Sequence, residues 1–252
     1  IARMSDPEET RFLLTLARGG SPPEEIGGLE GIALRRKIAD LRGVVLGLVS
    51  FEGSRKEAGR GTYVLEELTR QAGGAVLPGG VWPGFGEAWE KTRFRAPALR
   101  GALVPDGWVL EGIDAVVPWE EALGVGAHVR EAVQSAASGF GMRCRIHLQA
   151  GFPTSTTVGL ACSLIYPEPP GRALEAWSAI RQAVSAAFVA HGARLPQSPG
   201  IGSIERLGLD QILSPANRAE MQALKTVLDP HGVLNPGKVF LSEAASAPST
   251  VP

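Results

Sequence analysis

Apolar residues recur along this chain with two different spacings, and each spacing indicates one kind of element. Where they recur every three or four residues, the spacing predicts a helix with one apolar face. Five segments have this spacing: Ser5 to Gly19, Ser54 to Gly73, residues 119–138, residues 171–190 and the segment that ends at Leu228. Short apolar or alternating runs predict strands instead. These runs are residues 43–51, 75–77, 108–117, 142–149 and 158–166.

Two of the predicted helices begin with the spacing of a capping box. Ser5 precedes Glu8 by three residues, and Ser54 precedes Glu57 by the same interval. In a capping box the serine side chain accepts a hydrogen bond from the backbone amide three residues on, and the glutamate side chain accepts one from the serine amide. We therefore expect Ser5 and Ser54 to be the N-cap residues.

The strand and helix patterns also predict burial. The continuous apolar run from Gly43 to Phe51 is typical of a buried central strand, and the following helix and the strand 75–77 would complete a β-α-β unit. The runs 142–149 and 158–166 are expected to form a hairpin. In the helix 171–190, one buried face is expected to carry Leu174, Trp177, Ile180, Val184 and Phe188.

The order of these elements predicts an α+β fold. Helices would cover a mainly antiparallel sheet, and each half approximates a ferredoxin-like arrangement, although no internal sequence repeat supports this. Residues 1–240 are expected to form one domain. The Ala-, Ser- and Pro-rich residues 241–252 are expected to be a disordered tail.

Composition and charge exclude several classes of protein. A net charge of −1 over 252 residues gives no basic surface for nucleic acid or an anionic membrane. No apolar run approaches the roughly 20 residues of a membrane span. Two cysteines, Cys144 and Cys162, do not make a disulfide framework, so a reduced, cytoplasmic protein is expected. The chain begins Ile1-Ala2-Arg3 instead of with methionine, which indicates a piece of a longer protein.

The sequence contains no self-sufficient catalytic centre. Its Gly-x-Gly triplets, such as the one at Gly200, lack the third glycine of a dinucleotide-binding loop. The four histidines have no metal-ligand spacing, so no metal site is predicted. His147, on a predicted strand beside Arg145, is the histidine best placed for function. We therefore expect a module that works together with another domain.

The stretch from Leu228 to Phe240 is strongly constrained for the end of a chain. Asp229-Pro230 ends the preceding helix, a turn follows at Gly232, and Asn235-Pro236-Gly237 forms a second turn. Chain ends without such constraints are commonly disordered. Two interpretations stay open: an ordinary pair of turns that closes a domain, or a rigid segment docked against a partner.

Five segments occur in the same order as in one known family. They are RMSDPEET (3–10), WEKTRF with PALR (89–100), the strand and tryptophan of 111–119, CRIH (144–147) and LDPHGVLNPGK (228–238). They resemble the C-terminal domain of FAD-linked oxidases of the vanillyl-alcohol oxidase type. Within that type they are most similar to the alkyldihydroxyacetonephosphate synthase-like group. The terminal motif is the most specific of the five.

This resemblance implies a two-domain flavoenzyme. An N-terminal FAD-binding domain, which this chain lacks, would hold FAD. This chain would be the cap that covers the flavin and binds a small-molecule substrate. The terminal motif would return to the flavin, with Asn235 and Lys238 as cofactor-binding residues. Arg100 and His147 are the candidate catalytic residues, and the Arg100 guanidinium would bind an anionic group of the substrate. A homodimer stays an open alternative.

The chain also departs from that family. The family's histidine-rich loop corresponds to residues 194–202, which contain no histidine, and Leu160 to Leu164 occupy the place of a family tyrosine, with Tyr166 beyond them. The expected function is therefore the substrate domain of an FAD-dependent oxidoreductase that acts on a small hydroxylated substrate, with or without an anionic group. Two alternatives remain: an alkylglycerone-phosphate synthase-like transferase, and a non-catalytic ligand- or partner-binding module.

Overall fold

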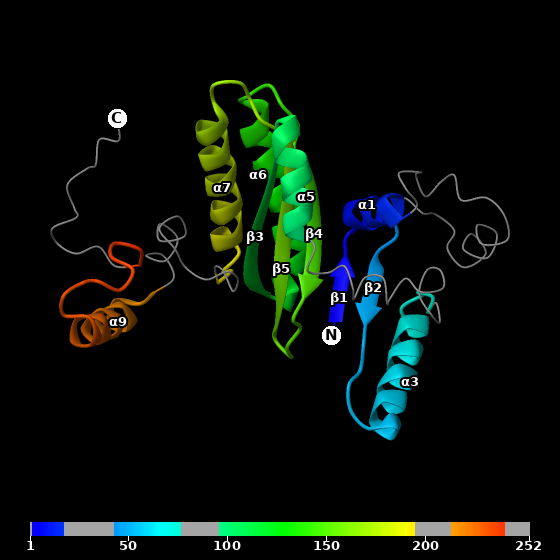
Figure 1. Ribbon diagram of the computed structural model, residues 1–252. Helices are drawn as coiled ribbons and strands as arrows, with labels where there is room; N and C mark the ends of the chain where they lie inside the picture. The colour runs from blue at the N-terminus through cyan, green and yellow to red at the C-terminus, as the bar shows by residue number, and fades with distance from the viewer. Residues whose placement is uncertain (1, 18–42, 77–95, 195–212, 240–252) are drawn as a thin grey trace.

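A five-stranded antiparallel sheet lies at the centre of the computed structural model, which describes residues 2–17, 43–76, 96–194 and 213–239 (Figure 1). The strand order is β2-β1-β4-β5-β3. The strands are β1 (Ala2–Ser5), β2 (Leu46–Val49), β3 (Trp108–Pro118), β4 (Arg145–Gly151) and β5 (Thr157–Pro167). The helices are α1 (Pro7–Ala17), α3 (Arg55–Gln71), α5 (Ala96–Leu103), η3 (Val104–Asp106), η4 (Trp119–Glu121), α6 (Ala122–Ser138), α7 (Ala173–Ala190) and α9 (Pro215–Leu228). The predicted α+β class is confirmed.

The three long strands carry the core on one side of the sheet. β5 pairs with β3 from Thr157 to Pro167 and with β4 from Gly159 to Ile165, and both pairings are antiparallel. Because side chains alternate along a strand, every second residue of β5 points to the same side. The buried set on β5 is Val158, Leu160, Cys162, Leu164 and Tyr166.

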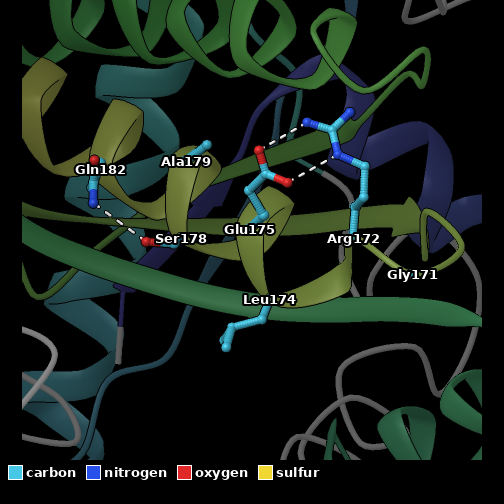
Figure 2. A pocket seen from close by; sticks show the side chains of 7 residues that line it. All are labelled: Gly171, Arg172, Leu174, Glu175, Ser178, Ala179 and Gln182. Atoms are coloured by element: carbon cyan, nitrogen blue, oxygen red, sulfur yellow. Dashed lines mark hydrogen bonds and ion pairs between the residues drawn. The ribbon is translucent and has the colours of Figure 1, made fainter. Parts of the chain in front are cut away.

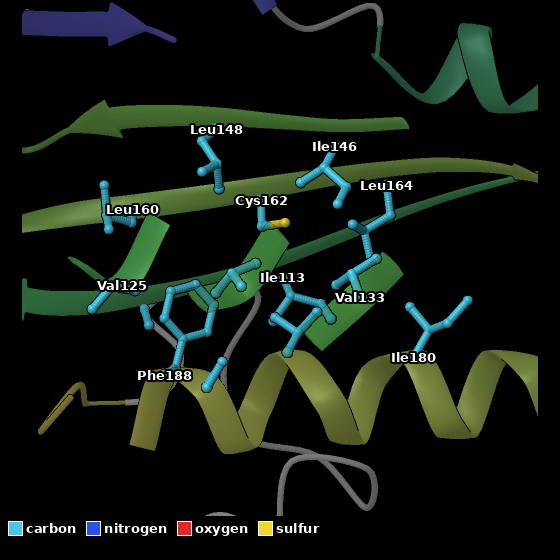
Figure 3. Packing of buried hydrophobic residues seen from close by; sticks show 14 of the residues in the cluster. Ile113, Val125, Val133, Ile146, Leu148, Leu160, Cys162, Leu164, Ile180 and Phe188 are labelled. Atoms are coloured by element: carbon cyan, nitrogen blue, oxygen red, sulfur yellow. The ribbon is translucent and has the colours of Figure 1, made fainter. Parts of the chain in front are cut away.

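Helices α6 and α7 cover this side of the sheet (Figure 3). Val129 and Val133 of α6 and Ile180 and Phe188 of α7 are fully buried against the strands. Cys144 and Cys162 are also buried on this side, and both are free thiols. Burial raises the pKa of each thiol to about 12, so both stay protonated near neutral pH.

Helix α1 lies against part of the other side of the sheet, and its start differs from the predicted capping box. Ser5 is the last residue of β1, and its hydroxyl bonds the Thr10 hydroxyl at 2.7 Å. The residue that caps α1 is Asp6, whose Oδ1 accepts a hydrogen bond from the Glu9 amide at 2.7 Å. The predicted cap was therefore wrong by one residue, because Ser5 is committed to the strand.

Asp6 also joins α1 to the core of the fold. Its Oδ2 accepts a hydrogen bond from the Leu148 amide of β4 at 3.0 Å and forms an ion pair with Arg130 of α6. Arg130 in turn donates to the Ile146 carbonyl at 2.9 Å. One carboxylate thus connects β1, α1, β4 and α6.

Several sequence predictions are confirmed, and three are wrong in addition to the cap at Ser5. The Ser54–Glu57 capping box and the hairpin of β4 and β5 are present. The run 43–51 is not a central strand, because only β2 forms there, at the edge of the sheet next to β1. Residues 74–76 are not in a strand, so the described part shows no β-α-β unit. Leu174, in the first turn of α7, is 75% exposed instead of buried. The predicted tail 241–252 and the segments 89–95 and 195–202 lie outside the described residues.

Helices α3 and α9 contain no buried residue. Both lie to the sides of the layer formed by the sheet with α6 and α7 (Figure 1). No described helix is long and apolar enough to span a membrane.

The two leucines Leu164 and Leu174 provide a matched test of this packing. Leu164 of β5 is fully buried, whereas Leu174 of α7 is largely exposed. We expect Leu164→Ala to lower the free energy of unfolding by about 2–5 kcal/mol. Leu174→Ala should change it by less than about 0.5 kcal/mol. Chemical denaturation of the two variants measures the difference, and equal losses would contradict the described packing.

Candidate functional site

The side of β3 and β5 that faces away from α6 and α7 is only partly covered. The residues on it, which we call the open face, are Gly112, Asp114, Val116, Gly159, Ala161 and Ser163. Gly112 is exposed and the other five are half-buried. Four of the six are glycine, alanine or serine, so the open face is shallow and leaves space above the backbone. A side chain added at Gly112, for example, would meet no atom within 4 Å.

Polar side chains border the open face on β4. The strand register places His147 opposite Ser163, and Gln149 opposite Ala161. Ala161 in turn lies opposite Asp114 of β3. Asp114, Ser163, Gln149 and His147 therefore occupy neighbouring positions on this side of β3, β5 and β4. Of these residues, the sequence alone indicated only His147. A polar residue between two apolar ones in a predicted strand, as at Ser163, is the signal that could have indicated the others.

His147 lies under α1. It is 5% exposed, and its ring packs against that of Phe12 with the centroids 4.6 Å apart. Burial, aided by the positive charges of Arg145 and Arg130, lowers the pKa of His147 to about 4. The imidazole is therefore neutral near pH 7 and can accept or donate a hydrogen bond without carrying charge.

Arg100 lies at the edge of the sheet, beside the first residues of β3. Its Nη2 donates a hydrogen bond to the Leu110 carbonyl of β3 at 2.7 Å, and the residue is exposed. Leu110 lies opposite Ile165, which lies opposite Arg145. Two guanidinium-bearing residues thus lie at one end of β3, β4 and β5, on either side of β5.

The closing loop after α9 (Asp229 to Val239) is organised by one carboxylate. Asp229 accepts hydrogen bonds from the amides of Val233 and Leu234, both at 2.9 Å, and from the Lys225 ammonium. The Lys225 ammonium also donates to the Leu234 carbonyl. The hydrogen bond from Lys225, followed by those from Leu234 and Val233, lowers the pKa of Asp229, so the carboxylate stays ionised near neutral pH.

The two predicted cofactor-binding residues lie in this loop. Asn235 has a left-handed backbone with φ +47°, and its carbonyl accepts a hydrogen bond from the Lys238 amide at 3.4 Å. Both residues are exposed. The closing loop lies apart from the sheet (Figure 1). The described structure therefore places Asn235 and Lys238 together in the closing loop. It does not bring Arg100 and His147 together, because Arg100 bonds β3 and His147 lies on β4, on the other side of β5.

Tyr166 does not provide the tyrosine that the resemblance leads one to look for. Its side chain points into the core on the side of α7 and is fully buried. The hydroxyl has no hydrogen-bond partner within the described residues. Burial raises the pKa of Tyr166 to about 12, so it stays protonated and away from the open face.

Two other polar features lie away from the open face. A shallow hollow follows the outer side of α7, where Arg172 and Glu175 pair with each other at 2.8 and 2.9 Å (Figure 2). At the end of α7, His191 bonds Glu121 at 2.7 Å and His128 at 3.1 Å. No spacing in the sequence indicates that these two histidines meet. No group of three or more His, Cys, Asp or Glu residues in the described part could hold a metal ion.

The described residues suit the edge of a flavin ring better than its phosphates. The exposed side chain of Asn235 is attached to a backbone that Asp229 and two turns hold in place. A fixed amide is a suitable hydrogen-bond partner for a polar ring edge. A recurring pyrophosphate site in proteins is a Gly-x-Gly-x-x-Gly loop that opens a helix, and none of the described helices begins with this motif.

Solved structures resemble this fold over almost the whole chain. An alkyldihydroxyacetonephosphate synthase has a TM-score of 0.68 and 16% sequence identity, with 94% of this chain and 39% of that chain covered. A 4-ethylphenol oxidase from Gulosibacter chungangensis, solved with isoeugenol, has a TM-score of 0.54 and 15% identity, with 94% of this chain and 47% of that chain covered. At these identities the likeness shows the fold alone. The chain spans less than half the length of either protein. No curated protein matches the sequence.

The family comparison covers most of the chain. The sequence profile described as "FAD linked oxidases, C-terminal domain" matches residues 13–239. This range includes all four predicted site residues and all of β3, β4 and β5. The chain therefore belongs to the family of FAD-linked oxidase C-terminal domains.

Proposed function

We propose that this chain is the substrate domain of an FAD-dependent oxidoreductase that acts on a small hydroxylated molecule. The open face carries the proposal. It combines hydrogen-bonding side chains, Asp114 and Ser163, with a floor of small residues, and a ligand site needs both a space and a few convergent polar groups. Membership of the family supplies the flavin context.

The partner in this proposal is an FAD-binding domain outside the chain. α9 and the closing loop expose six large apolar side chains: Met221, Leu224, Val227, Leu228, Val233 and Leu234. A helix of 14 residues is marginal in water unless its apolar face packs on something. Exposed apolar surface of this kind commonly marks an interface. Docking of this surface would bring Asn235 and Lys238 to the flavin.

Each predicted site residue has a role in this arrangement. When bound, FAD supplies an acceptor for the electrons removed from the substrate. Asn235 would donate or accept a hydrogen bond at the edge of the flavin, and Lys238 would favour negative charge there. Arg100 would hold an anionic group of the substrate, for which its planar fork is suited. Neutral His147, which Phe12 covers, would position Ser163, the residue opposite it, at the substrate hydroxyl.

The first test is whether the two-domain protein is a flavoprotein. The coding sequence upstream of Ile1 should be expressed together with this chain, and the product should show flavin absorbance. Anaerobic addition of a hydroxylated substrate should bleach that absorbance. The 252-residue chain alone should bind no FAD tightly. A colourless two-domain protein would refute the proposal, and a yellow one that no hydroxylated substrate bleaches would favour the synthase-like transferase.

Asn235 can be tested through the flavin spectrum of the same protein. Asn235→Ala should shift the visible absorbance bands and lower the rate of flavin reduction by roughly 10- to 100-fold, because a polar contact to the cofactor is lost. Asn217→Ala is the matched control, since Asn217 is an exposed asparagine of α9 outside the closing loop. An unchanged spectrum with unchanged kinetics in Asn235→Ala would place this residue away from the flavin.

The neutral state of His147 predicts a pH dependence of stability. Between pH 6.5, the ordinary pKa, and about 4, the unfolded chain binds a proton that the folded His147 does not. Stability contributed by neutral His147 is therefore complete above pH 6.5 and lost as the pH falls towards 4. His147→Gln should show a shallower loss in this window than the unsubstituted chain. His231→Gln, at an exposed histidine, should keep the original slope. Equal slopes in all three proteins, measured by denaturation at several pH values, would show that His147 titrates normally.

A further inference from the structure

Phe152, directly after β4, combines two unfavourable features. Its backbone is left-handed, with φ +48°, and its side chain is 81% exposed. For a bulky residue a positive φ is a genuine outlier, because Cβ crowds the following carbonyl oxygen. Apart from glycines, the only other residue with positive φ in the described chain is Asn235. Such strain persists only where the surrounding structure imposes it, and it is concentrated at functional sites.

The surroundings of Phe152 hold the hairpin rigidly. The Thr154 amide donates to the Thr157 carbonyl at 2.8 Å, and the Thr157 amide donates to the Thr154 hydroxyl at 2.9 Å. The Trp119 indole nitrogen donates to the Thr154 carbonyl at 2.9 Å. These bonds hold the backbone of the hairpin, so they set the place from which the Phe152 side chain projects.

That place is the end of the open face. A Cβ atom built on Gly159 would lie 3.7 Å from Cδ2 of the Phe152 ring. Because Gly159 lies between the buried residues Val158 and Leu160, its Cβ direction is that of the open face. The Phe152 ring therefore borders the open face over Gly159, next to Val116 on β3.

The open face consequently changes in polarity along β5. Phe152 and Val116 form an apolar end at Gly159, and Asp114 and Ser163 supply polar groups further along. Gly159 and Ser163 are four residues apart, which corresponds to about 13 Å along a strand. A molecule with an apolar part and a hydroxylated part fits this distance and this order.

We propose that Phe152 determines substrate specificity by packing its ring against the apolar part of the substrate. The substrate class is then a hydroxylated molecule with an aromatic or alkyl part, in which the hydroxyl lies towards Asp114 and Ser163. This inference rests on the proposed function, since it assumes that the open face binds the substrate. In this proposal the bound substrate covers the Phe152 ring. This role accounts for a phenylalanine that is strained and exposed when no substrate is bound.

Binding of 2-naphthol, which has an apolar ring system and one hydroxyl, tests this role in the two-domain protein. Phe152→Leu should weaken 2-naphthol binding, measured by its fluorescence, by roughly 3- to 10-fold, because an aromatic contact is lost. Phe152→Gly should weaken binding further. The control is Phe51→Leu, at a partly exposed phenylalanine next to α3, which should leave binding unchanged.

Thermal melting separates this role from a structural one. Glycine adopts positive φ without strain, so Phe152→Gly should raise the melting temperature by about 2–4 °C while weakening 2-naphthol binding. A lower melting temperature would make Phe152 a structural residue and overturn the inference. Unchanged 2-naphthol binding in both Phe152 variants, or no binding to the unsubstituted protein, would also overturn it. If the Phe152 variants no longer associate with the FAD-binding domain, the inference is also overturned, because the ring would then belong to a contact between domains.

These outcomes are distinct from failure of the proposed function. A two-domain protein that lacks flavin, or whose flavin no substrate reduces, would count against the oxidoreductase. Neither the melting temperature nor the fluorescence of 2-naphthol depends on flavin reduction. Loss of affinity together with a raised melting temperature would still support Phe152 as a ligand-binding residue.

Discussion

β5 is hydrogen-bonded to β3 on one side and to β4 on the other, and this double pairing decides which side chains can act together. The register aligns Cys162 with Ile113 and Leu148 in the core, and it aligns Ser163 with His147 on the opposite side. A slip of one residue would exchange the two sets, with Ser163 in the core and Cys162 outside. The apolar contacts of α6 and α7 exclude that exchange. The same strand register therefore determines both the packing of the core and the placement of the polar groups.

α1 decides how much of the second side of the sheet stays accessible. Its Phe12 covers His147, and Thr10 covers Ser5, so the chain itself closes this side of the sheet around these two residues. Asp6 holds this arrangement through its bonds to β4 and Arg130. The side of β3 and β5 that faces away from α6 and α7 stays partly exposed. The position of the candidate site is thus set by a carboxylate that does not belong to it.

The sequence predicted the elements whose signal is local, and it failed where tertiary context decides. The capping box at Ser54 and the hairpin after Arg145 depend on neighbouring residues, and both are present. The apolar run 43–51 indicated burial, but a run of this kind does not say whether a strand is central or at an edge, and β2 is at the edge. Ser5 and Asp6 are both good caps, and only the pairing of β1 excludes Ser5. The open face required the register of three strands, which no spacing along one segment contains.

The hydrogen bonds of Asp229 have a consequence for association. A loop that becomes ordered only on contact loses conformational entropy at that moment, at about 1–2 kcal/mol for each residue whose backbone is fixed. In this chain the amides of Val233 and Leu234 and the ammonium of Lys225 are already bound to one carboxylate. The loop that carries Asn235 has therefore lost most of this freedom during folding. Less of the free energy of contact is then spent on ordering, and more of it remains as affinity.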